Sequence, residues 1–240
     1  MTREADAVRA GLPVAVPAGA GGRTMAQPGL RGAFRALYDA YGPQHWWPAD
    51  GPFEVMVGAV LTQNTAWSNV ERALERLTAR APISPEALLR LPPAELAELI
   101  RPVGYFNVKA RRLQAFCAAY LDEGGLRGLA AWPTDELRRR LLRIHGVGPE
   151  TADDMLLYAF GRPVFVVDAY TRRVFTRLGT LAGGEGYEAI RHRFESTLGP
   201  DVALYNEYHA LIVRHGKEVC RTKPRCAGCC LRGQCPVGRE

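Results

Sequence analysis

The 240-residue sequence predicts an all-α protein. From Gly29 onward, apolar residues recur at the spacing of amphipathic helices over most of the chain. Many of these periodic segments start at a proline or a polar residue, and several end on glycine, as helices do. The only strand candidate is "VFVV" at 164–167, which is too short to found a sheet, and no repeat of solenoid period is present.

The helical segments follow one another along the chain. The segment "FRALYDAYG" ends on Gly42, and "PFEVMVGAVLTQNTAWSNVERALERLTAR" contains two helical patterns separated by the polar patch at 62–65. Each of "SPEALLRL", "PPAELAELIRPVG" and "NVKARRLQAFCAAYLDEGG" also carries an apolar stripe and predicts a helix.

Residues 1–28 are rich in Ala, Gly and Pro and predict a disordered leader, within which Met25 is an alternative start. Prolines and glycines break the apolar stretch "AGLPVAVPAGAGG", which argues against a signal peptide. No run is long and apolar enough for a transmembrane helix. We therefore expect a cytoplasmic, nucleoid-associated monomer without membrane contact, whose cysteines are reduced thiols or ligands.

Composition and charge fit a soluble globular protein of one large or two small domains, with 47% hydrophobic and 23% charged residues. The formal net charge is +6, and between Arg101 and Arg143 nine Lys or Arg face four Asp or Glu. A basic surplus attracts polyanions, of which nucleic acid is the commonest. Charge alone does not distinguish a nucleic-acid binder from a protein with solvated surface charges.

The stretch "HGVGPETADD" at 145–154 lies between two helical patterns. Its glycines tolerate positive φ, and Pro149 suits the first turn of the second helix. Apolar residues from Ala152 to Phe160 are expected to form one face of this helix. This pattern predicts a helix–hairpin–helix, with an ordinary tight αα-turn as the alternative. Such a bend offers main-chain N–H groups to a phosphate. The backbone-binding candidates are Gly146, Val147, Gly148 and Thr151.

Asp168, in "VFVVDAYTRRVF", directly follows the second helix of the hairpin. An aspartate ahead of a helix is expected to cap its N-terminus. A carboxylate in this position also suits the electrostatic stabilisation of a developing cation, and the two roles are compatible.

Four cysteines near the C-terminus form the pattern C-x5-C-x2-C-x5-C and predict a metal site. Zinc sites more usually show two C-x2-C pairs, so the spacing favours a 4Fe-4S cluster, with zinc as the alternative. Cys230 is expected to be a spectator, and Cys117 to belong to the core. The expected ligands are Cys220, Cys226, Cys229 and Cys235.

Four segments in order, "LTQNTAWSNVERAL", "IRPVGYFNVKARRL", "IHGVGPETADDMLLYAFGRPVFVVDAYTRRVF" and "HGKEVCRTKPRCAGC", carry a family resemblance. Over about residues 30–235 the chain resembles the endonuclease III superfamily of DNA glycosylases. The resemblance implies a six-helix barrel with the helix–hairpin–helix at 48–162. It also implies a helical cluster subdomain formed by 29–47 and 163–240. The implied partner is double-stranded DNA that contains damaged bases.

The resemblance also implies residue roles. Asp168 would be the catalytic aspartate, which stabilises an oxocarbenium-like sugar and orients the attacking water. Gln63 would fill the gap left by a flipped nucleotide, and Tyr105 would be the wedge on the opposite strand. The alternative interpretations are a buried amide and a core aromatic residue.

Glu150 stands where family members with lyase activity carry a lysine, whose amine attacks the sugar. A carboxylate cannot form the imine, so we expect a monofunctional glycosylase that leaves the strand intact. As an alternative, Glu150 is simply a favourable acidic residue in the first turn of a helix.

Trp46, Trp47, Pro48 and Trp67 flank the helix that ends near Gln63, and "WWP" with "LTQNT" resembles the 3-methyladenine glycosylase branch. An N-alkylated purine is positively charged and stacks well on indole rings, so these residues predict a base pocket. Lys217, where endonuclease III usually has arginine, is expected to line it. As an alternative, the tryptophans belong to the core. For the protein as a whole, the alternatives are a glycosylase for oxidised or mismatched pyrimidines and a non-catalytic DNA-binding protein.

Overall fold

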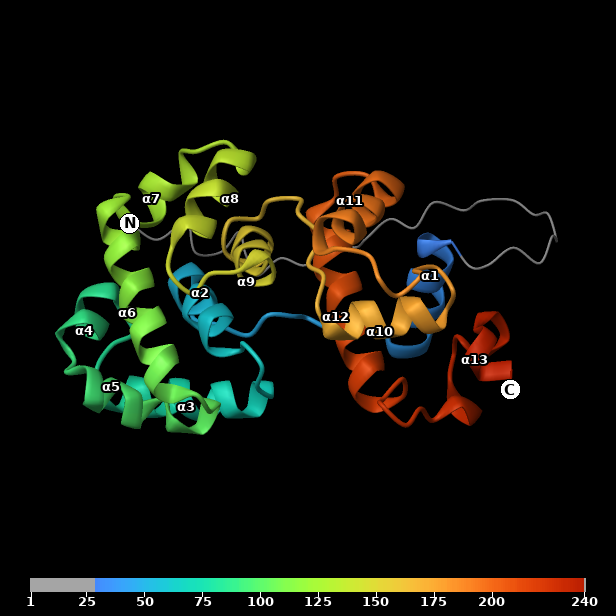
Figure 1. The fold of residues 1–240 in the computed structure, drawn as a ribbon, viewed down its shortest axis with the longest axis horizontal. Helices are drawn as coiled ribbons and strands as arrows, with labels where there is room; N and C mark the ends of the chain where they lie inside the picture. Colours follow the sequence, from blue (N-terminus) through green and yellow to red (C-terminus); the bar gives the residue numbers. More distant parts are fainter. Residues whose placement is uncertain (1–28, 240) are drawn as a thin grey trace. The chain divides into compact units, whose positions relative to one another are not determined.

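The computed structural model describes residues 29–239, so the expected leader at 1–28, with Met25, lies outside the described residues. The described part is helical throughout and has no β-strand, which confirms the predicted fold class (Figure 1). The segment at 164–167 is buried but forms no strand within this part of the chain. The α-helices are α1 (Leu30–Tyr41), α2 (Pro52–Leu61), α3 (Trp67–Arg80), α4 (Pro85–Arg90), α5 (Pro93–Leu99), α6 (Phe106–Asp122), α7 (Gly125–Ala130), α8 (Thr134–Arg143), α9 (Pro149–Asp154), α10 (Ala169–Arg177), α11 (Tyr187–Leu198), α12 (Val202–Glu218) and α13 (Pro236–Arg239).

The chain divides into two compact units. The central unit is the continuous segment Trp47–Val166, and the terminal unit combines the described residues 29–46 and 167–239. The boundaries expected from the sequence lie after residues 47 and 162.

The central unit is built around α2, in which every residue from Val55 to Leu61 is buried. This helix is apolar on all sides, as expected of a helix enclosed by others. It packs against α6 and α9, and α6 in turn packs against α4 and α5 (Figure 1). Cys117, on α6, is buried in this core as expected.

The helix–hairpin–helix is formed by α8 and α9, which are joined by a buried ion pair. The Arg138 Nε donates to Asp153 Oδ1 at 2.6 Å and its Nη2 donates to Oδ2 at 3.1 Å, and Asp153 is fully buried. The second helix is α-helical over only part of the stretch in which one apolar face was expected. After Asp154 the chain makes a π-helical turn at Met155–Ala159, closed by the Phe160 N–H donating to Met155 O. Because a π turn holds more residues than an α turn, residues beyond it leave the face that an α pattern predicts.

The terminal unit centres on α12, which packs against α10 and α1. Segments from the two ends of the chain meet here: the buried Tyr208 hydroxyl donates to Leu30 O at 2.6 Å. The Arg31 guanidinium donates to Leu198 O at 2.5 Å, which ties α1 to the end of α11. The N-terminal helix is therefore an integral part of this unit.

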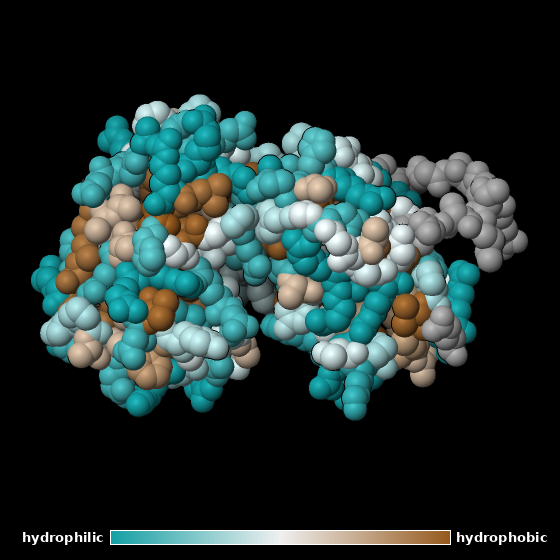
Figure 2. All heavy atoms as spheres, in the orientation of Figure 1, coloured by the Kyte–Doolittle hydropathy of each residue, from teal (hydrophilic) through white to brown (hydrophobic). Residues whose placement is uncertain are grey.

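None of the described helices is both long and apolar enough to pass through a bilayer. On the face shown in Figure 2, hydrophilic residues cover most of the surface of each unit, and hydrophobic patches are small.

Candidate functional site

The hairpin bend between α8 and α9 has the geometry expected from its glycines. Gly146 has φ +87°, and a Cβ at this position would lie 2.2 Å from the Arg112 Cγ, so only glycine fits. Gly148 is the N-cap of α9, and Pro149 occupies the first turn. The Val147 N–H, one of the expected phosphate donors, already donates to Ile144 O at 3.0 Å.

Gln63 lies half-buried in the polar turn between α2 and α3, and its amide is fully engaged. Its Nε2 donates to Gly146 O at 2.9 Å and to Thr151 Oγ1 at 3.0 Å. Its Oε1 accepts from the Arg112 Nη1 at 2.5 Å. The side chain therefore links the turn directly to the hairpin, a connection that the sequence does not reveal.

Tyr105 is 71% exposed, so the alternative interpretation as a core aromatic residue is wrong. It is the N-cap of α6 and has left-handed backbone geometry, with φ +46°. A bulky residue seldom adopts this conformation. The preceding Gly104 also has positive φ, so the turn presents the ring to solvent.

Of the expected base-pocket residues, Trp47, Pro48 and Trp67 belong to the central unit, and the two tryptophans come together. The rings of Trp47 and Trp67 meet edge to face, with centroids 4.8 Å apart, and Gly58 of α2 leaves room for both. Tyr158 joins them, with its ring 5.0 Å from that of Trp47. Tyr158 lies on the π turn, so the helical pattern of the sequence gave no signal for it. Pro48, which follows Trp47 in the sequence, is exposed.

Trp46 and Lys217 come together in the terminal unit. The Lys217 Nζ lies over the Trp46 ring, 5.7 Å from its centroid. This distance is within the range of a cation–π contact.

Asp168 caps α10 as expected: its Oδ1 accepts from the Thr171 N–H at 2.6 Å. Its other oxygen lies 3.6 Å from the Nε2 of His209, on α12, and the residue is only 9% exposed. Burial alone would raise the pKa of Asp168, but the contacts with His209 and Thr171 outweigh it and hold the pKa below its usual value. The carboxylate is thus kept ionised although it is buried. Sequence reasoning missed His209, which reaches Asp168 from 41 positions along the chain.

Glu150 is exposed in the first turn of α9. An acidic residue here interacts favourably with the helix dipole. Its carboxylate takes the position at which the resemblance puts a lysine in lyases.

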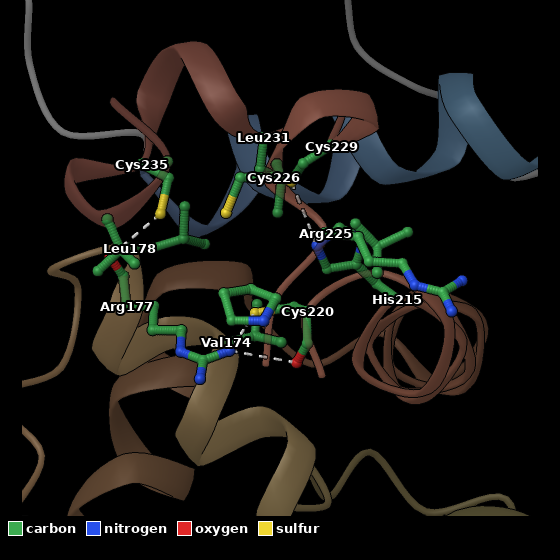
Figure 3. A pocket seen from close by; sticks show the side chains of 14 residues that line it. Val174, Arg177, Leu178, His215, Cys220, Arg225, Cys226, Cys229, Leu231 and Cys235 are labelled. Atoms are coloured by element: carbon green, nitrogen blue, oxygen red, sulfur yellow. Dashed lines mark hydrogen bonds between the residues drawn. The ribbon is translucent and has the colours of Figure 1, made fainter. Parts of the chain in front are cut away.

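The four expected metal ligands line one pocket of the terminal unit: Cys220, Cys226, Cys229 and Cys235. In Figure 3 the sulfur atoms of Cys226 and Cys235 point into this pocket, and Cys220 lies on its opposite side. The Arg177 Nη1 donates to the Cys220 Sγ at 3.4 Å, and the His215 Nε2 lies 3.6 Å from the Cys229 Sγ (Figure 3).

None of the six cysteines forms a disulfide. Among the described residues, no three His, Cys, Asp or Glu side chains form a group that could hold a metal ion. The pocket lining nevertheless includes the four cysteines of the sequence pattern and not Cys230, the expected spectator.

A helical chain with a glycine-rich hairpin between α8 and α9 and a buried aspartate at the N-terminus of α10 defines a helix–hairpin–helix protein. Residues 57–200 match the model of the family described as HhH-GPD superfamily base excision DNA repair protein. The chain belongs to this superfamily and is a DNA glycosylase, which confirms the resemblance.

Two relatives illustrate the similarity. A protein of Methanocaldococcus jannaschii that is named as a DNA repair glycosylase is 45% identical over 205 residues, which cover 84% of this chain and 93% of the relative. Endonuclease III of Thermotoga maritima is 28% identical over 193 residues, covering 79% of this chain and 84% of the relative.

Solved structures show the same fold. A non-covalent endonuclease III–DNA complex has a TM-score of 0.77 at 24% identity and covers 89% of this chain and 97% of its own. The H. pylori 3-methyladenine DNA glycosylase bound to 1,N6-ethenoadenine has a TM-score of 0.68 at 28% identity, covering 78% of this chain and 96% of its own.

Proposed function

We propose that this chain is a monofunctional glycosylase that removes N-alkylated purines, such as 3-methyladenine, from duplex DNA. The observation that carries the proposal is the buried, ionised carboxylate of Asp168 at the N-terminus of α10. Such a group stabilises the positive charge that develops on the sugar as the base leaves. A non-catalytic DNA-binding protein gains nothing from a carboxylate close to phosphates.

The aromatic residues support the alkylated-purine substrate. The Trp47–Trp67–Tyr158 cluster offers electron-rich faces, on which a cationic purine stacks strongly. A base that already carries positive charge is also a good leaving group and needs little acid catalysis. The named likeness to a 3-methyladenine DNA glycosylase points the same way.

Glu150 supports the monofunctional chemistry. Without an amine at this position no imine forms with the sugar, so water attacks and the strand stays intact. Gln63 and Tyr105 are the proposed wedge residues, and the hairpin backbone with Thr151 the proposed phosphate grip.

The direct test is incubation with methylated duplex DNA, followed by analysis of the released bases. We expect release of 3-methyladenine without strand cleavage and without a borohydride-trapped adduct. Asp168→Asn should abolish base release and preserve DNA affinity. The matched control is Asp201→Asn, because Asp201 caps α12 through the Leu204 N–H at 2.9 Å in the same way.

Three outcomes would overturn parts of the proposal. Release of oxidised or mismatched pyrimidines instead of alkylated purines would assign an endonuclease III-like substrate, which relatives of that name favour. Efficient nicking of abasic DNA with a trapped adduct would refute the monofunctional chemistry. Equal loss of DNA affinity and base release in Asp168→Asn would favour a binding module.

Glu150→Lys offers a test by gain of function. If Glu150 alone withholds lyase chemistry, the new amine should form a borohydride-trapped adduct with abasic DNA. Glu136→Lys is a suitable control, because Glu136 lies in the first turn of α8 and faces Arg139 and Arg140 instead of the hairpin bend. An adduct with the control would show non-specific reactivity.

We further propose that the four pocket cysteines hold a 4Fe-4S cluster. Thiolates are the ligands of such clusters, and the Arg177 N–H group offers a hydrogen bond to one of them. When bound, the cluster would cross-link four positions between 220 and 235. Brown protein with bound iron and sulfide is the expected result, lost in Cys226→Ala but retained in Cys230→Ala. Colourless protein with stoichiometric zinc would refute it.

As a repair glycosylase it is proposed to act as a monomer on double-stranded DNA in the cytoplasm, in association with the nucleoid. Gel filtration of the protein alone and with duplex DNA tests the monomer.

A further inference from the structure

Helix α6 carries the Tyr105 turn at its N-terminus and two cationic side chains, Lys109 and Arg112, in the following turns. The Lys109 N–H donates to Tyr105 O at 3.0 Å, so the wedge turn and the first helical turn are continuous. The Gln63 turn, 42 positions earlier in the chain, reaches both cationic side chains.

Lys109 is only 2% exposed and joins the two turns directly. Its Nζ donates to Leu61 O at 3.0 Å and to Val103 O at 2.9 Å. Leu61 is the last residue of α2, two positions before Gln63, and Val103 comes two positions before Tyr105. Carbonyls at helix ends lack partners within the helix, and one amine satisfies both.

The cost of burying this amine indicates that the arrangement is not incidental. Desolvation, assisted by the nearby charge of Arg112, lowers the pKa of Lys109 to about 8. A methionine would fill similar space in the core without this penalty. The contact with two carbonyls is what distinguishes lysine from an apolar residue here.

Arg112 holds the Gln63 turn from a second side. Its Nη1 donates to Gln63 Oε1 at 2.5 Å, and its methylene groups lie across Gly146 of the hairpin. Gln63 in turn donates to Gly146 O and Thr151 Oγ1. The glutamine turn, the tyrosine turn and the hairpin therefore share one set of contacts centred on α6.

We infer that Lys109 and Arg112 are positioning residues that couple the two wedges, Gln63 and Tyr105, so that both enter the duplex as one unit. The inference rests on the proposed function, which assigns the wedge roles. Extruding a nucleotide costs a few kcal/mol of unpairing and unstacking. If the two side chains are already held in a fixed relation, they enter the two strands without losing further conformational entropy.

The test compares one lesion in two settings. Single-turnover release of 3-methyladenine is measured from a fully paired duplex and from a duplex with a one-nucleotide gap opposite the lesion, in which the damaged base is already unpaired. Lys109→Met and Arg112→Met should each slow release from the paired duplex about tenfold, equivalent to about 1.4 kcal/mol. Release from the gapped duplex should stay within about twofold of the wild type, since flipping there needs no wedge.

Two further measurements separate positioning from general stability. The fluorescence of 2-aminopurine beside the lesion reports flipping directly, and it should rise less in the variants than in the wild type. Adding Tyr105→Ala should slow base release from the paired duplex more in the wild type than in Lys109→Met, because Lys109→Met has already lost the coupling between the wedges. Arg111→Met is the matched control, because it removes the same charge from an exposed position of α6. This variant should release the base from both duplexes at the wild-type rates.

Equal slowing on both duplexes, or unchanged rates on both, would overturn the inference. If Lys109→Met does not fold, the half-buried Arg112→Met carries the test. If the wild-type enzyme releases no alkylated purine from either duplex, the proposed substrate is wrong, and the positioning inference is not affected. The same paired-to-gapped ratio would then be measured with whichever base the enzyme removes.

Discussion

At the scale of single residues, Asp168 shows how one carboxylate serves the fold and the chemistry. One oxygen caps α10, and the other faces His209 at 3.6 Å. The favourable contacts hold its pKa low although burial opposes this, so the group stays charged as acid is added. A carboxylate with a lowered pKa in the folded protein loses its charge only at more acidic pH than in the unfolded chain.

His209→Phe should therefore move the acidic limb of the base-release profile to higher pH. Without the histidine, burial dominates and raises the pKa of Asp168, so the active ionised form is lost earlier on acidification. The pH dependence of single-turnover base release measures this shift. His192→Phe, at an exposed site, should leave the profile unchanged. Superimposable profiles for wild type and His209→Phe would show that the contact has no electrostatic role.

The buried amine of Lys109 leads to a second prediction, on how the free energy of unfolding depends on pH. In the folded protein the pKa of Lys109 is about 8, below its ordinary value of 10.5, so the unfolded chain binds more protons between these limits. The free energy of unfolding should consequently rise with pH from 8 to 10.5, relative to Lys109→Met, by about 1 to 3 kcal/mol. Urea unfolding of both proteins from pH 7 to 11 measures the difference. A pH-independent difference would contradict the lowered pKa.

Several residues of the site were within reach of the sequence and others were not. Asp168 as a helix cap follows a local pattern, and the structure has it. The exposure of Tyr105 was expected only from the family resemblance, which implies a wedge at this position, and its side chain is exposed. A lysine at position 109 on the apolar stripe that continues to Leu113 was a visible signal, although its two carbonyl partners were not. His209 and Tyr158 depend on tertiary contacts that no local pattern encodes.

At the scale of elements, the hairpin depends on Gly146 and much less on Gly148. Gly146→Ala combines positive φ with a Cβ 2.2 Å from Arg112, so it should lower the free energy of unfolding by about 1 to 3 kcal/mol. Gly148→Ala, where nothing lies within 4 Å of a Cβ and φ is −95°, should change stability by less than about 0.5 kcal/mol. Chemical unfolding measures both, and equal losses would contradict the geometry.

The two helices of the hairpin are also joined by Arg138 and Asp153. Asp153→Ala leaves the arginine without its buried partner and should cost about 3 to 5 kcal/mol. Glu136→Ala removes exposed-side pairs with Arg139 and Arg140 and should cost about 1 kcal/mol or less. Thermal unfolding of the two variants measures the contrast. A small effect of Asp153→Ala would mean that solvent reaches the pair.

Most helix boundaries were predictable because prolines, polar caps and glycines mark them in the sequence. The break at 62–65 and the start of α9 at Pro149 follow these marks. The π turn was not predictable, because apolar residues at 155, 156, 159 and 160 fit an α-helix equally well. Which hydrogen bonds close that turn depends on packing against α2.

At the scale of the whole molecule, the buried apolar cluster from Met56 to Val164 lies entirely within the central unit. A fragment of residues 47–166 should therefore fold alone into a helical protein with a cooperative unfolding transition of several kcal/mol, as domains of this size do. Circular dichroism during heating and amide chemical-shift dispersion test this. A fragment with helical signal but no cooperative transition would show that the core needs the terminal unit.

The terminal unit has a different origin, because α1 and α12 come from opposite ends of the chain. During synthesis on the ribosome, α1 emerges before the central unit, and its partner α12 emerges only after it. The four pocket cysteines follow α12. The order of translation therefore places any metal loading after the central unit has emerged, when its core has already had time to form.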